Sequence, residues 1–155
     1  MILHGVWQFF HLLFAFSWVG SLVVAEWNGR AARATEDWAQ RATQFQIIHM
    51  SARVAGAGSL LLAGLLGFGS AATAGIHLRD SWLWAAALVW VLALFAMFLL
   101  NVPYSARLAA IARLAAGGGS SDGWNTALIR WRFANVVQSA LYVAALALMV
   151  FRWRA

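Results

Sequence analysis

The side chains of this sequence that are best suited to bind a metal or a redox cofactor are four histidines: His4, His11, His49 and His77. His11 stands in a run from Gly5 to Ala25 that contains no Lys, Arg, Asp or Glu. At 1.5 Å per residue, this run is long enough to cross a hydrocarbon layer of roughly 30 Å. An ionisable side chain at membrane depth is costly, so it is by default a functional-site hypothesis. His11 is therefore the first candidate ligand, and a hydrogen bond across a helix interface is the alternative.

The partners available to His11 define a first candidate site near the outer side of the membrane. His4 lies seven residues earlier on the same helix face, and His77 is expected in a loop at the same side. Met149 of the last helix is expected at similar depth and offers a thioether. His/His and His/Met pairs both ligate haem iron, and copper also uses these ligands.

A second candidate site lies near the inner side, where His49 and Met97 are expected at similar depth. His11 and His49 stand on antiparallel helices and differ in depth by very roughly 15 Å, so they cannot bind one iron atom together. Arg53 lies four residues after His49 on the same face. We expect it to pair with Glu26 at the end of the first helix; the alternative is binding of a haem propionate or a lipid phosphate.

Polar residues recur on one face of the last helix at spacings of three, four and seven: Arg132, Asn135, Gln138, Ser139 and Tyr142. In lipid this face must point into the bundle. It either lines a quinone or tetrapyrrole site, with Asn135 as a binding residue, or ties helices together. A row of small residues in the second helix is also expected to face another helix, since small residues let backbones approach closely: Ser51, Ala55, Ser59, Ala63 and Gly67.

The composition places these residues in an all-α integral membrane protein. The 155 residues are 63% hydrophobic and 10% charged, against about 25% charged residues in soluble domains. The pattern predicts a single domain, residues 1–155, with membrane helices at about 5–27, 45–69, 82–102 and 129–152. Pro103 is expected to end the third helix, followed by an interfacial helix from Tyr104 to Ala116. The fold class is thus a four-helix transmembrane bundle with an interfacial helix between its third and fourth helices.

Several classes of protein are excluded or disfavoured. Without cysteine the chain has no disulfide, thiolate zinc site, iron–sulfur cluster or c-type haem attachment. Its net charge of +6 reflects topology, and it carries no nucleic-acid motif. The arginines concentrate in the first and third connections, which predicts both termini on the periplasmic side of a bacterial inner membrane. The expected partners are the lipid bilayer and possible further membrane subunits or copies of the chain.

The pattern His11-x6-Trp18-x-Gly20 resembles the opening of a group of small bacterial membrane proteins. The group includes the copper-resistance D family, the HemJ-type protoporphyrinogen oxidases and an uncharacterised four-helix family of predicted integral membrane proteins, which this chain resembles most. Arg132-Phe133-Ala134-Asn135 is similar to the Arg-x-x-Asn pattern of the HemJ-type enzymes. The resemblance implies that His11 corresponds to their first-helix histidine and that the protein binds a b-type haem. Those enzymes also carry a lysine at the start of the third helix, whereas this chain contains no lysine.

Three hypotheses about function follow. The first is binding of haem b through His11, in a redox or electron-transfer role. The second is a non-catalytic accessory subunit of a larger membrane complex. The third is binding or transport of copper through His11, His49 and the methionines.

Overall fold

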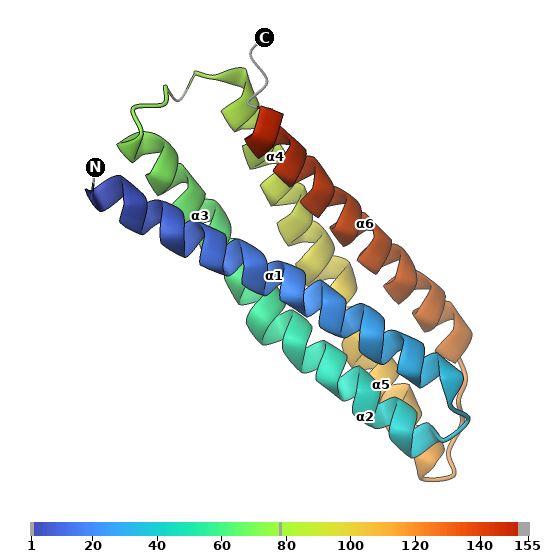
Figure 1. The fold of residues 1–155 in the computed structure, drawn as a ribbon. Helices are drawn as coiled ribbons and strands as arrows, with labels where there is room; N and C mark the ends of the chain where they lie inside the picture. The colour runs from blue at the N-terminus through green and yellow to red at the C-terminus, as the bar shows by residue number, and fades with distance from the viewer. Residues whose placement is uncertain (1, 78, 152–155) are drawn as a thin grey trace.

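The computed structural model describes residues 2–77 and 79–151, and these residues form helices and connections with no strand. Four long helices run up and down beside one another (Figure 1). The first is α1 (Ile2–Ala34). The second comprises α2 (Trp38–Ser51), the π-helix η1 (Ala52–Ala57) and α3 (Gly58–Thr73). The third comprises α4 (Ser81–Ala96), the π-helix η2 (Met97–Asn101) and α5 (Val102–Ala116), and the fourth is α6 (Trp124–Phe151).

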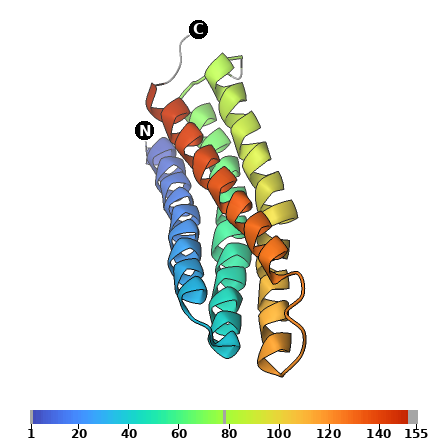
Figure 2. The same cartoon turned by 90° about the vertical axis from the view of Figure 1, so that its right-hand side faces the viewer.

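All four are long and apolar enough to cross a membrane, with 33, 36, 36 and 28 residues in chain order. This confirms the predicted number of membrane-length helices. The termini lie at one end, and the α1–α2 and α5–α6 connections lie at the other (Figure 2). We call the two ends of the bundle the terminal half and the loop half.

The helices extend beyond the predicted bounds, mostly into the loop half. Residues 5–27 were expected where α1 covers Ile2–Ala34, and residues 45–69 where the second long helix covers Trp38–Thr73. The fourth helix begins at Trp124 rather than at residue 129, and its predicted last residue, Arg152, lies outside the described residues. A helix of 36 residues is about 54 Å long, which exceeds the roughly 30 Å hydrocarbon layer.

Pro103 does not end the third helix, and the prediction of a separate helix after it is wrong. The helix runs without a break from Ser81 to Ala116. Proline has no N–H and its ring clashes with the preceding turn of a regular α-helix. Here the preceding turn is the wider π-helix η2, in which the Val102 N–H donates to the Met97 carbonyl, and Pro103 stands in the first turn of α5. Instead of standing alone, α5 packs against α2.

The loop half has a dense aromatic core. Phe45 of α2 is fully buried and meets the rings of Trp124 and Trp131 edge to face, at centroid distances of 5.4 and 5.2 Å. Trp131 packs directly against Gly29 of α1, where a Cβ would overlap its ring. Small residues of α5, including Ala109 and Ala112, close the core with no exposed surface.

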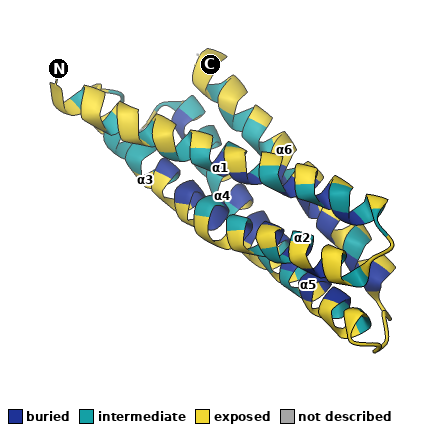
Figure 3. Ribbon diagram, turned by 60° about the horizontal axis from the view of Figure 1, so that its bottom comes forward, coloured by how far each residue is buried: buried dark blue, intermediate teal, exposed yellow. Residues whose placement is uncertain are grey.

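The terminal half is packed more loosely. There α1 packs along α3 and α4 packs along α6, and the two pairs diverge toward the termini (Figure 1). None of residues 2–17 of α1 is buried, and none of residues 139–151 of α6 is buried (Figure 3). The loosely packed half is also the half that carries His4 and His11.

Candidate functional site

His11 is held by one hydrogen bond to the backbone of α3. Its Nδ1 lies 2.7 Å from the Ala63 carbonyl oxygen, and because a carbonyl only accepts, Nδ1 carries the proton. The ring lies against Gly67, where a Cβ would approach Nδ1 and Cε1 to 3.1 Å. In a neutral imidazole with a protonated Nδ1, the lone pair is on Nε2. This is the state in which a histidine binds a metal through Nε2.

His4 repeats the arrangement two turns away. Its Nδ1 lies 3.2 Å from the Ser70 carbonyl oxygen and 3.2 Å from the Thr73 hydroxyl. The two histidines are seven residues apart, and so are their carbonyl partners, Ala63 and Ser70, on the antiparallel helix α3. The predicted shared face of His4 and His11 is therefore confirmed, and both rings sit on α3.

The small-residue row makes the contact with α1 possible. Ser59 donates to the Ser17 hydroxyl at 2.9 Å, Ala63 accepts from His11, and Gly67 leaves room for the imidazole. These three members of the row face another helix, as predicted, and the structure shows that this helix is α1.

The inner candidate site is not assembled as predicted. His49 is half-buried, and its Nδ1 lies 3.2 Å from the Val102 carbonyl oxygen and 3.4 Å from the Ser105 hydroxyl of α5. Met97 is fully buried, but it packs in a cluster with Trp18 and its methyl group faces Gly56, about two turns along the helix from His49. His49 and Met97 thus stand in different contacts.

The other predicted ligands lie at the edge of the terminal half. His77 is exposed in the connection between α3 and α4, and Met149 is 36% exposed near the end of α6. Within the described part of the chain, no three His, Asp or Glu side chains gather as a metal cluster. His11 is the best-oriented single ligand among the described histidines, because its Nδ1 contact with a carbonyl oxygen is 2.7 Å long against 3.2 Å for His4 and for His49.

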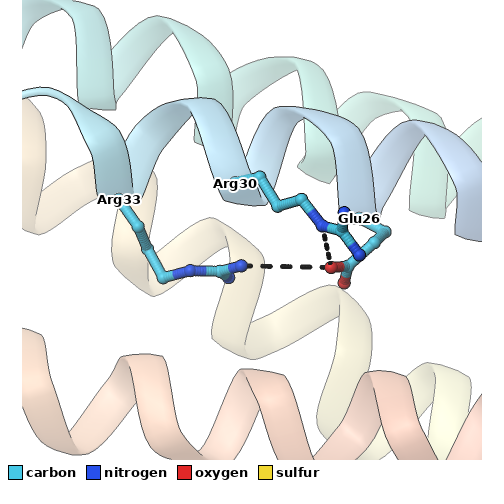
Figure 4. Close-up of polar contacts among 3 residues, drawn as sticks. All are labelled: Glu26, Arg30 and Arg33. Carbon is cyan, nitrogen blue, oxygen red and sulfur yellow. Dashed lines mark hydrogen bonds and ion pairs between the residues drawn. The ribbon is translucent and has the colours of Figure 1, made fainter.

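The predicted ion pair between Arg53 and Glu26 is not formed. Glu26 Oε1 lies 2.7 Å from Arg30 Nε and 3.9 Å from Arg33 Nη2, both on its own helix (Figure 4). Arg30 is four residues away along α1, a spacing that brings the two side chains together without help from another helix. Arg53 is exposed on η1. Binding of an anionic group by Arg53, the alternative to this ion pair, stays a prediction.

Two members of the polar stripe on α6 tie helices together. Asn135 accepts a hydrogen bond from Asn101 Nδ2 at 3.0 Å, and Gln138 Nε2 donates to the Ala93 carbonyl oxygen at 2.8 Å. Tyr142 meets Trp18 edge to face at 5.4 Å. Arg132 and Ser139 are exposed and take no part in this seam.

Asn101 is a buried polar residue that the sequence analysis does not identify. Its position directly after residues 81–100, a run of the same helix that contains no charged residue, is the available signal. An amide so placed needs a partner, and the facing stripe on α6 contains one.

A pocket of about 470 Å³ lies at the far end of the loop half, remote from the histidines. Trp38, Arg41 and Trp124 line it together with the linker before α6. The Arg41 guanidinium lies 4.4 Å from the Trp38 ring centroid and 5.6 Å from that of Trp124, and its Nε donates to the Thr35 carbonyl at 2.9 Å. Through Arg41, these contacts link Thr35 in the α1–α2 connection with Trp124 at the start of α6.

Comparison of the chain with protein-family models, with curated proteins and with solved structures finds no match.

Proposed function

We propose that the four helices cross a bacterial inner membrane with both termini in the periplasm, and that the protein binds haem b through His11 in an electron-transfer role. The single observation that carries the second part is the His11 hydrogen bond to Ala63, which leaves Nε2 as the free ligand atom in a membrane-length apolar helix. A bound haem b supplies one-electron chemistry at its iron.

The orientation is supported by the arginines. Of the nine described arginines, Arg79 lies in the terminal half and Arg53 lies on η1 between the halves. The other seven cluster at the loop half: Arg30, Arg33, Arg41, Arg107, Arg113, Arg130 and Arg132. Short basic segments favour the cytoplasmic side. With no native cysteine to interfere, single cysteines can report this. We expect Ala74→Cys to react with an impermeant maleimide in intact cells and Ser121→Cys to react only after lysis; the reverse pattern would contradict the orientation.

The residues around His11 fit a haem ligand. Gly67 and the Ala63 carbonyl orient the imidazole, so the ring does not have to be ordered again when the iron binds. The divergence of the α1–α3 and α4–α6 pairs leaves this half without the packed core seen in the loop half. His4, His77 and Met149 are the candidates for the second axial position.

The visible spectrum tests this proposal. Protein purified from cells supplied with haem is expected to show a Soret band that sharpens, with α and β bands, on reduction by dithionite. A flat spectrum together with bound copper would favour the copper hypothesis, and a flat spectrum without metal would favour an accessory subunit.

Enlarging Gly67 is expected to weaken haem binding by displacing the His11 ring. A leucine there would occupy the space of Cε1 and Nδ1 and break the bond to Ala63. Losing such an orienting contact costs about 10–100-fold in metal affinity. Haem titration of Gly67→Leu measures the loss. Gly20→Leu is the matched control, because Gly20 is exposed on α1 with no atom near its Cβ position; equal affinity in both variants would argue against His11 as the oriented ligand.

A further inference from the structure

Five buried side-chain polar atoms have no hydrogen-bond partner within the described residues. One, Gln44 Oε1, is on α2, and the other four lie on α6 or on residues that contact it: Trp131 Nε1, Asn101 Oδ1, Gln138 Oε1 and Trp18 Nε1. Their side chains are nearly or fully buried, with exposed fractions of 0%, 1%, 0% and 5% in the same order. A buried polar atom without a partner is strongly unfavourable, and native proteins rarely leave one so. Four in one row call for a common explanation.

The four atoms follow the inward face of α6. Trp131 and Gln138 belong to this helix, Asn101 is bonded to its Asn135, and Trp18 packs on its Tyr142. The positions on α6 are thus 131, 135, 138 and 142. They are four, three and four residues apart, which corresponds to steps of about 6, 4.5 and 6 Å along the helix axis. One water molecule with two hydrogen bonds of about 2.8 Å spans such a step.

In the order of these positions the four atoms are a donor, an acceptor, an acceptor and a donor, so they form two donor–acceptor pairs that water can bridge. An indole Nε1–H is only a donor. Gln138 uses its Nε2 on the Ala93 carbonyl, which fixes its Oε1 as the free acceptor, because a flipped amide would set two carbonyl oxygens against each other. Asn101 likewise uses Nδ2 on Asn135 and is left with Oδ1. Each donor therefore has an acceptor one step away.

We propose that two internal water molecules belong to this fold. The first accepts from Trp18 Nε1–H and donates to Gln138 Oε1. The second accepts from Trp131 Nε1–H and donates to Asn101 Oδ1. Each water thereby gains polar partners of the kind that hold buried waters in place.

With these two waters, the centre of the bundle contains a hydrated row of polar groups at the level of η2, where the two halves meet. The buried members of the polar stripe on α6, Asn135 and Gln138, would then serve this hydrated row and not a ligand pocket. The proposal does not rest on haem binding, since none of its residues contacts His11 in the hydrogen bonds described above.

Water contacts of the indole protons in ¹⁵N-tryptophan-labelled protein test the proposal. In detergent micelles, Trp18 and Trp131 are expected to show cross-peaks from their Nε1–H to water with a long residence time. Trp90 is the matched internal control, because its Nε1 donates to the Leu60 carbonyl at 2.8 Å and needs no water. Gln138→Met is expected to remove the water cross-peak of Trp18 and to keep that of Trp131.

Two results would overturn the proposal. One is the absence of water cross-peaks at the Trp18 and Trp131 indoles of the native protein, which would mean that no water is bound at either site. The other is an equally strong cross-peak at Trp90, which would mean general solvent penetration rather than two built sites. Both results come from the unmodified sequence, so a variant that fails to fold leaves the test intact.

Discussion

Replacing His11 with alanine is expected to abolish haem b binding, with the Soret absorbance per chain falling below about a tenth of its native value. Loss of a group that merely orients a metal ligand already costs about 10–100-fold in affinity, so loss of the ligand itself costs more. His49→Ala is the matched control. Its Nδ1 is also held by a backbone carbonyl, that of Val102, but it stands on α2, away from α3. Absorbance of the purified variants measures the effect.

Rescue by a free ligand separates a ligand role from a structural one. In His11→Gly, added imidazole is expected to restore the reduced spectrum, because the exogenous ring supplies the missing nitrogen. If His11→Ala retains haem and His49→Ala loses it, the haem site lies at His49 in the loop half and not at His11. Restoration of folding by imidazole without any change in spectrum would make His11 a packing residue.

Gly29→Ala is expected to destabilise the loop half by about 1–3 kcal/mol, which is the usual cost of overpacking a dense core. The new Cβ would overlap the fully buried Trp131 ring. That ring also packs edge to face on Phe45 and has no exposed surface, so the surrounding core resists its displacement. At roughly 2–4 °C per kcal/mol for a chain of this size, the unfolding midpoint in detergent falls by several degrees.

Gly58→Ala serves as its control. Gly58 is exposed and helical, and no atom lies within 4 Å of its Cβ position. Alanine there gains up to about 1 kcal/mol of helix propensity, so the midpoint is expected to hold or rise. A midpoint for Gly29→Ala at or above that of Gly58→Ala would contradict the tight contact between Gly29 and Trp131.

The sequence predicts the number of membrane-length helices because each shows an uninterrupted apolar run. It does not predict how far the helices continue into the loop half. There the buried face is made by Ala109 and Ala112 and by a few aromatic residues, while charged residues cover the outside. Mean hydropathy falls in such segments, so the pattern that marks lipid contact ends before the helix does.

The end of the third helix is the second feature that the sequence predicts wrongly. Pro103 is a sound signal for the end of a regular α-helix, but a π-helix before it accommodates the ring. Nothing in the residue types of η2 indicates the extra residue in its turn. The continuation of the helix through Pro103 therefore comes only from the structure.

Within the candidate site, residue types and spacing predict the shared face of His4 and His11 and the small-residue row that meets it. They do not predict the partner of His11, because a backbone carbonyl has no sequence signature. The Arg53–Glu26 prediction fails for a related reason. An unpaired charge is costly in a membrane, which favours an ion pair, but Arg30 and Arg33 of the same helix are nearer to Glu26 than Arg53 is.

Haem content of the native protein is the most direct test of the proposed function. Protein purified in mild detergent from haem-sufficient cells would be assayed by its reduced pyridine haemochrome and by amino-acid analysis. We expect about one haem b per chain. Acid–acetone extraction is expected to remove all of this haem from the protein, because haem b is not covalently attached. A ratio near zero, in protein whose unfolding midpoint shows that it is folded, would contradict the proposed function.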